Sequence, residues 1–277
     1  MKNSFLVLFC VMLFFSSMIL NAQVGKIDND TLVNYVDINN KKQGKWVKYY
    51  ENSKQIKYKG NFLNDKPVGV FYYYHNNGNI KSILNYEDNG SSFAEIYWEN
   101  TNMSASGEYT AEHKRNNLWK MYYEDGSLAF VVNYKDGETE GLTTMYYPGT
   151  NTAKVMEVNY KNGKLEGEYR RYFKSKRIQE EGNIVNGRKN GLWKSYTPEG
   201  ILEEQGMYEN GKRQGDWIIY NKETQKNETI NYKNDIPENY KELMKELKEK
   251  EKWAKENQDK FKHPEDFFDN PLEFFKD

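Results

Sequence analysis

The residue types that most often perform catalysis or bind metals are few in this sequence, and their spacing is not typical of a site. The three histidines, His75, His113 and His263, lie far apart in the chain and lack the short intervals of metal ligands. No Gly-x-Ser-x-Gly motif, phosphate-binding loop or Ser/His/Asp arrangement is recognisable. We therefore predict a protein that is not an enzyme, with no catalytic residues, no metal ligands and no cofactor.

One basic cluster is the candidate for anion binding. Its residues are Arg170, Arg171, Lys174 and Arg177. Because side chains alternate along a strand, these charges are expected on both faces of the strand and in the turn after it. This favours charged side chains that are exposed to solvent over a single binding site. The alternative is a site for a phosphate or a lipid headgroup.

Composition narrows the classes of partner. The chain has 277 residues with 40 basic and 41 acidic side chains, so no net charge points to nucleic acid. Aromatic residues make up 16% of the chain, with 23 Tyr, 14 Phe and 6 Trp, while the mean hydropathy is −1.00. Such a composition favours a thin structure in which rings pack, rather than a globule with a thick aliphatic core.

The first residues are typical of a targeting segment. An apolar run follows Lys2 and ends before a plausible cleavage point after Ala22, so residues 1–22 are predicted to be a signal peptide. A retained membrane anchor is the alternative. Cys10 lies inside this run, and no cysteine follows it, which excludes a disulfide scaffold from the rest of the chain. We expect secretion across the inner membrane to a bacterial periplasm or cell surface.

A repeated phrase organises the chain after residue 42. Gly-x-Trp-x-x-Tyr or a variant of it begins at 44, 69, 117, 141, 167, 191 and 215, and a weakened copy begins at Ser92. A second phrase with an aromatic or β-branched residue runs in phase with it, and Asn-Gly or Asp-Gly pairs separate the two. Because these pairs favour tight hairpin turns, each repeat is predicted to contain two antiparallel strands. The fold class is therefore all-β: an elongated antiparallel meander of about eight β-hairpin repeats, with a period of ~24 residues, followed by a C-terminal α-helix.

Strand alternation assigns structural roles within each repeat. Trp46 and Lys48 are expected on one face and Val47 and Tyr49 on the other, so that rings stack into ladders along the sheet. The glycines at 44, 69, 167, 191 and 215 are expected to leave space for a ring from a neighbouring strand. The predicted structural residues are Gly44, Trp46, Tyr49, Trp119, Tyr122, Gly191, Trp193, Tyr196, Gly215, Trp217 and Tyr220.

These phrases support a resemblance to a known family. The stretch from Gly206 to Trp217, GMYENGKRQGDW, resembles the MORN repeat in its bacterial variant form. The resemblance covers residues 43–236, is clear in six repeats and is loose in those that start near 69 and 92. It implies an array of β-hairpins used in protein association. Lipid binding is proposed for eukaryotic members, and some bacterial members carry an antitoxin label, which the signal peptide makes less applicable here.

The C-terminal part departs from the repeat. Residues 23–42 are expected to form an N-terminal lead-in or cap, residues 43–236 the array, residues 237–262 a charged amphipathic helix and residues 263–277 an acidic aromatic tail. Asp235 and Glu238 resemble a capping box with Pro237 in the first turn, and the thin apolar stripe of the helix predicts that it lies on another element. Phe267, Phe268, Phe274 and Phe275 are expected either to cover the last strand edge or to dock a protein partner.

Taken together, these features predict a secreted scaffold that binds a protein partner of unknown identity through its sheet. Two alternatives stay open at this point. One is an antitoxin or immunity partner of a toxin, and the other is binding to an envelope lipid or glycan through the basic cluster.

Overall fold

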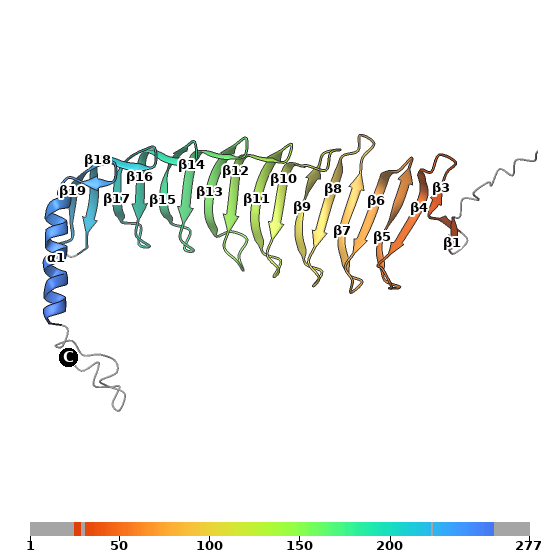
Figure 1. Cartoon of the computed structure of the whole chain (residues 1–277), viewed down its shortest axis with the longest axis horizontal. Coiled ribbons are helices and arrows are strands. Elements are labelled where there is room, and N and C mark those ends of the chain that lie inside the picture. Colours follow the sequence, from red (N-terminus) through yellow and green to blue (C-terminus); the bar gives the residue numbers. More distant parts are fainter. Residues whose placement is uncertain (1–24, 29–30, 223, 258–277) are drawn as a thin grey trace, which may run out of the picture. The chain divides into compact units, whose positions relative to one another are not determined.

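The computed structural model describes residues 25–28, 31–222 and 224–257. The chain divides into two compact units, an N-terminal unit (residues 1–92) and a C-terminal unit (residues 93–277), and each is described by itself. In both, consecutive strands form antiparallel hairpins, as the ribbon in Figure 1 shows. The prediction of an all-β meander with a C-terminal helix is confirmed.

The N-terminal unit begins with a separate pair of strands. β1 (Lys26–Asp28) pairs with β2 (Thr31–Val33), and a meander of β3 to β7 follows. The bounds of the meander strands are β3 Tyr35–Val36, β4 Lys42–Tyr49, β5 Ile56–Leu63, β6 Lys66–Tyr74 and β7 Ile80–Tyr86. β8 (Ser92–Tyr97) starts at the boundary between the units.

In the C-terminal unit, each strand from β9 to β19 pairs with the next one in the chain. The bounds are β9 Met103–Tyr109, β10 Arg115–Tyr122, β11 Leu128–Lys135, β12 Glu138–Tyr146, β13 Lys154–Lys161, β14 Lys164–Tyr172, β15 Ile178–Val185, β16 Arg188–Tyr196, β17 Leu202–Glu209, β18 Lys212–Asn221 and β19 Lys226–Lys233. The short β20 (Ile236–Pro237) pairs with the end of β19, and α1 (Tyr240–Glu256) follows it.

The Asn-Gly and Asp-Gly turns adopt the conformation that the sequence predicts. Asn162 and Gly163 have φ angles of 49° and 72°, and Asn210 and Gly211 have φ angles of 52° and 84°. Positive φ at both central residues is the mark of a type I′ hairpin turn, whose twist matches that of the flanking strands. The turns thereby fix the register of each hairpin.

One face of the sheet, here called the ring face, carries the buried aromatic side chains. Phe71, Trp119, Trp193 and Trp217 are at most 2% exposed. Each ring lies over a glycine of the preceding strand, and a methyl group added there would overlap the ring; these glycines are Gly60, Gly107, Gly182 and Gly206. Edge-to-face contacts continue the ladder, for example from Tyr208 to both Trp193 and Trp217, with ring centroids 5.9 and 5.1 Å apart.

The prediction about which glycines make room for rings is therefore wrong. Gly44, Gly69, Gly191 and Gly215 have φ angles between 64° and 75°, and no atom lies within 4 Å of a Cβ added to any of them. Gly167 has a φ of 102° and meets only the side chain of Asn159. These glycines are needed because L-residues with side chains rarely adopt such angles. Gly69, Gly167, Gly191 and Gly215 lie where the register against the preceding strand shifts by two residues, as between Gln205 and Met207 opposite β18.

Each of the four tryptophans at the ring position is also covered by a cation. Lys42, Arg115, Lys189 and Arg213 stand four residues before Trp46, Trp119, Trp193 and Trp217, at 5.0, 4.7, 4.1 and 4.1 Å from the ring centroids. Repeats with another residue in place of Trp lack the cation, and Pro67, Thr139 and Leu165 occupy its position. These basic side chains are thus part of the packing of the ring face.

Hydrogen bonds tie successive repeats together at both ends of the strands. At one end, the turn glycines Gly163 and Gly187 donate to the carbonyl oxygens of Thr139 and Leu165 in the preceding repeat, at 2.9 and 3.0 Å. At the other end, the Tyr123 and Tyr147 hydroxyls donate to the carbonyl oxygens of Tyr146 and Tyr172 in the following repeat, at 2.9 and 3.0 Å. Each repeat therefore stabilises its neighbours, as expected for a repeat protein.

The helix differs from the prediction in two respects. It begins at Tyr240 after Asn239, which makes no side-chain capping bond, while Asp235 accepts the N–H of Arg213 at 2.7 Å in a hairpin turn. The capping box is therefore wrong, because β20 continues the sheet through Pro237. No residue of α1 is buried, so the expectation that the helix lies on another element is also wrong for its described residues.

Candidate partner-binding surface

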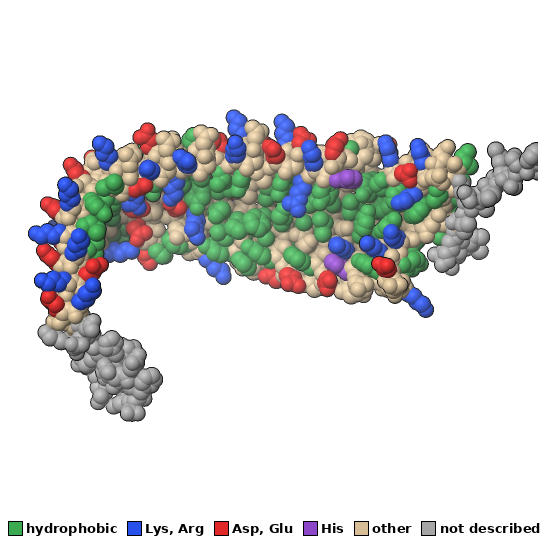
Figure 2. Space-filling model, viewed as in Figure 1, with side chains coloured by type: hydrophobic (Ala, Val, Ile, Leu, Met, Phe, Trp, Pro, Cys, Tyr) green, Lys and Arg blue, Asp and Glu red, His purple; other side chains and the backbone are tan. Residues whose placement is uncertain are grey.

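The face opposite the rings, here called the open face, displays one exposed side chain per repeat. This side chain precedes the ring position, and strand alternation turns it away from the ring face. In the C-terminal unit the row consists of Phe93, Leu118, Leu142, Glu168, Leu192 and Asp216, here called the open-face row. Leu118, Leu142 and Leu192 are 45%, 44% and 49% exposed. Figure 2 shows one side of the molecule, on which hydrophobic side chains gather in a band between polar and charged side chains.

Amide side chains lie opposite this row on the neighbouring strands. Leu118, Leu142 and Glu168 have Asn133, Asn159 and Asn183 as their cross-strand partners. Asn159 Nδ2 donates to the Glu168 carbonyl oxygen at 3.2 Å. The amides of Asn133 and Asn183 have no hydrogen-bond partner among the described residues, which leaves donors and acceptors beside apolar side chains. Leu192 instead faces Met207, and both are 49% exposed.

A polar network lies beside the row on the same face. Tyr172 donates to Glu157 at 2.5 Å, and Tyr196 donates to Glu181 at 2.9 Å. Burial and these hydrogen bonds raise the pKa of both tyrosines to about 12. Burial raises the pKa of Glu157, but the hydrogen bonds from Lys154 and Tyr172 outweigh it, so that the pKa lies below its usual value. The network therefore holds the Glu157 carboxylate ionised and the two phenols neutral.

The four basic residues proposed for anion binding do not converge. Arg170 lies on the open face, 3.2 Å from Glu168 and 3.8 Å from Glu181. Arg171 pairs with Glu180 across the strands and therefore points to the ring face. Arg177 donates to the carbonyl oxygen of Pro198 at 2.8 Å, and Lys174 is an exposed turn residue. A shallow hollow of about 230 Å³ beside Arg170 is lined by acidic as well as basic groups.

The remaining sites proposed from the sequence lie in turns or outside the described residues. His113 is exposed in a turn, and the backbone of His75 closes another turn with Asn79. Phe267, Phe268, Phe274, Phe275 and His263 lie outside the described residues, as does the predicted signal peptide. In the part of the chain that the structure describes, no group of three or more His, Cys, Asp or Glu side chains is arranged to hold a metal ion. The helix described there is too short and polar to cross a membrane.

The open-face row was missed by the reasoning from sequence. Its signal was present, because a leucine precedes the ring position at 118, 142 and 192. The alternation of side chains along a strand predicts only that the residue before the ring position points away from the ring face. Whether a second layer covers it depends on the rest of the fold, and here no described element does so.

Comparison with known proteins agrees with this repeat organisation. The model of the MORN repeat variant family matches residues 67–88, 115–136 and 189–210, which contain Phe71, Trp119 and Trp193. A comparison with curated proteins gave no match.

Two solved structures give only weak likenesses. One is the crystal structure of a mutant of S. aureus TarM in complex with Fondaparinux, alpha-GlcNAc-glycerol and UDP, with 9% identity and a TM-score of 0.22 over 52% of this chain and 21% of that one. The other is a protein with unknown function from Bacteroides fragilis, with 10% identity and a TM-score of 0.09 over 70% of this chain and 92% of that one. This chain thus spans about a fifth of the length of the first, and at these TM-scores neither likeness bears on its fold or function. The family match, together with the repeated turns and rings, shows that the chain contains repeats of the MORN variant type.

Proposed function

We propose that this protein is a secreted, non-enzymatic scaffold that binds a protein partner through the open face of its repeat array. MORN repeats point to a repeat scaffold, and the residues that repeat here specify turns, rings and their covering cations. The positions left free to vary are those of the open-face row. Recognition of a partner is therefore assigned to that row and the amides beside it.

The observation that carries this proposal is the exposure of the leucine series. Leu118, Leu142 and Leu192 recur at the same position of their repeats, each between 44% and 49% exposed. Recurrent exposed apolar side chains on a single sheet face are typical of an interaction surface. Flanking amides and charges, such as Asn133 and Lys120, supply the polar rim that protein interfaces carry.

The cellular place of this function follows from the sequence alone. Residues 1–22 have the pattern of a signal peptide, so we place the protein in the periplasm or on the cell surface of a bacterium. A partner is accordingly expected among envelope proteins.

The test is affinity enrichment from native envelope extract with the wild-type protein and with a variant that carries Leu118→Lys, Leu142→Lys and Leu192→Lys. We expect one protein to be recovered by the wild type and lost by the variant, because three buried ammonium groups would oppose association. A control variant gains the same charge at exposed positions between strands, by Thr152→Lys, Ser175→Lys and Thr224→Lys. It should recover the partner normally.

Each other outcome has a definite meaning. Recovery of the same protein by all three forms would exclude the open-face row as the binding surface. Recovery of none, together with sedimentation on anionic vesicles that Arg170→Ala and Arg177→Ala abolish, would favour the lipid alternative. A recovered one-to-one partner with toxic activity would make this protein an immunity protein.

A further inference from the structure

The last long strand of the array has an open edge. β19 pairs with β18 at eight positions, from Gln214 with Lys233 to Asn221 with Lys226. On its other side, β20 covers only Tyr232 and Lys233, and the Glu238 N–H donates to the Asn231 carbonyl oxygen at 2.8 Å. No described strand pairs with residues 226–230 on that side.

Alternation of backbone groups identifies which atoms are exposed on this edge. In an antiparallel strand the N–H and C=O of one residue point to the same side, and those of the next residue point to the opposite side. Because the Asn231 carbonyl points away from β18, the N–H and C=O of Thr229 and Asn227 point away from it too. Neither residue has a backbone partner on that side among the described residues. The β18–β19 pairing also contains no bulge, so this edge is regular.

The open edge arises because a further repeat starts and then stops. Ile236 and Pro237 pair with Lys233 and Tyr232 in the same way that Lys212 and Arg213 pair with Glu209 and Tyr208 one repeat earlier. The chain then leaves the sheet and forms α1 from Tyr240. The rest of a first strand, including the residue that would correspond to Trp217, is missing from this repeat.

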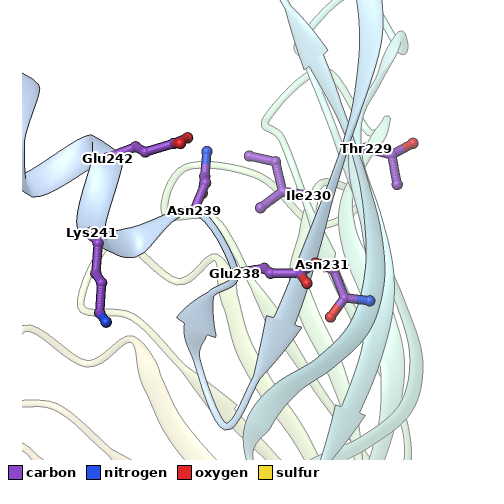
Figure 3. A pocket seen from close by; sticks show the side chains of 7 residues that line it. All are labelled: Thr229, Ile230, Asn231, Glu238, Asn239, Lys241 and Glu242. Atoms are coloured by element: carbon purple, nitrogen blue, oxygen red, sulfur yellow. The ribbon is translucent and has the colours of Figure 1, made fainter.

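A hollow of about 540 Å³ occupies the place of the missing strand. Figure 3 shows it between β19 and the start of α1. Its lining residues are Thr229, Ile230 and Asn231 from the strand and Glu238, Asn239, Lys241 and Glu242 from the segment that leads into the helix. Ile230 is the cross-strand partner of Trp217 and therefore lies on the ring face.

The first long strand of the array, in contrast, has a covered edge. The side chain of Asn34 donates to the Val47 carbonyl oxygen at 3.0 Å and accepts the Val47 N–H at 2.8 Å, as a neighbouring strand would do. β3 covers Lys42 and Gln43 of the same strand. A second copy of this chain consequently has no free first strand to offer to β19 in a head-to-tail arrangement.

We propose that the edge of β19 binds an extended segment of another polypeptide, which completes the interrupted repeat as an added antiparallel strand. Backbone groups of Asn227 and Thr229 bind the segment, and a tyrosine at the position equivalent to Trp217 stands opposite Ile230, as Tyr169 stands opposite Val158 in an earlier repeat.

The probe is a labelled synthetic peptide with the sequence of residues 164–174, KLEGEYRRYFK, which is the first strand of the repeat whose Tyr169 stands opposite Val158. Fluorescence anisotropy with the purified protein should show saturable binding. A peptide with Ala in place of its first Tyr should bind more weakly. The Thr229→Pro variant removes the outward N–H while leaving the pairing with β18, and it should weaken binding about tenfold. Thr229→Val keeps the N–H and should bind normally.

A second measurement leaves the protein unchanged. N-methylation at alternate residues removes the N–H groups along one edge of the peptide. The peptide that is methylated on the edge facing β19 should not bind, and the peptide that is methylated on the opposite edge should bind. No binding to the wild type, or equal binding to the Thr229→Pro variant when both are folded by circular dichroism, would overturn the proposal. If the peptide bound only to a chain that ends at Asn257, residues 258–277 of the same chain would be the segment that occupies the edge of β19. This result would also overturn the proposal.

Discussion

At the scale of the residue, the repeat uses glycine for two separate purposes. Gly206 has an ordinary backbone conformation, and its lack of a side chain lets Trp217 lie on the strand. Gly215 has a φ of 66° and open space around it, so only its backbone conformation matters. Asn117 confirms this distinction, because it stands at the corresponding position of its own repeat with a φ of 56°.

We predict different tolerances at the two glycines. Gly206→Ala forces the added methyl group into the indole and should lower the free energy of unfolding by about 1–3 kcal/mol. Gly215→Asn should lower it by less than about 1 kcal/mol, since asparagine accepts the left-handed conformation. Denaturant unfolding followed by tryptophan fluorescence measures both. Equal losses in the two variants would contradict the assignment of roles.

The buried phenols of the open face predict a dependence on alkaline pH. Tyr172 and Tyr196 have pKa values of about 12, against 10.0 in the unfolded chain. Between these values the unfolded state loses protons that the folded state keeps, so stability is fully present below pH 10 and falls as the pH rises toward 12. The double variant Tyr172→Phe and Tyr196→Phe should show a shallower fall in thermal unfolding temperature over this range. An unchanged slope would contradict the hydrogen bonds to Glu157 and Glu181.

Only part of the ring packing can be predicted from the sequence. The positions of the tryptophans can be predicted from the repeat. The contact between each tryptophan and the cation four residues before it cannot, because it depends on the β-bulge between the two residues. The prediction that Gly191 and Gly215 make room for rings was wrong for a related reason. A sequence shows that two glycines recur, but the register shift determines which of them faces a ring.

At the scale of the element, the edge strands β4 and β19 differ in whether their outer backbone groups are covered. β4 is covered by a side chain that imitates a strand, while β19 is left open after two paired residues. Exposed edges promote unwanted pairing, so natural proteins usually cover or shorten them. The cover on β4 is therefore expected to contribute to local stability.

This contribution can be isolated with two asparagines of similar conformation. Asn34 and Asn40 have φ angles of 59° and 60°, but Asn40 is exposed and has no side-chain hydrogen bond among the described residues. Asn34→Ala should reduce the protection of the Val47 amide from hydrogen exchange about fivefold, because one net hydrogen bond is worth about 1 kcal/mol. Asn40→Ala has the same conformational cost and should leave that amide unchanged. Equal effects would mean that Asn34 acts only through its backbone.

Helix α1 shows the limit of prediction for a single element. Its existence followed from the spacing of charged pairs and apolar residues, but its start and its surroundings did not. Tyr240, Leu243 and Leu247 are 49%, 37% and 51% exposed, so the stripe that predicted a contact is not buried. The start moved to Tyr240 because Ile236 and Pro237 continue the sheet, a choice made by strand pairing rather than by helix signals.

At the scale of the whole molecule, period and turn chemistry were sufficient to predict the architecture. Each repeat interacts with its neighbours through rings, turn amides and tyrosine hydroxyls, so a local pattern repeated many times specifies the array. The proposed binding surface was harder to predict, because the fold requires nothing of the open-face row except its direction. Our proposal assigns recognition to the positions that the repeat leaves unspecified.

The most direct test of this account is site-specific photo-crosslinking. A photoreactive phenylalanine derivative is placed at Leu142 or Leu192 on the open face, and at Ser195 on the ring face as the control, and the protein is irradiated in native envelope extract. We predict that one protein is crosslinked from positions 142 and 192 and none from 195. Crosslinking from 195 alone, or no crosslinked protein from any of the three positions, would contradict the claim that the open face binds a protein partner.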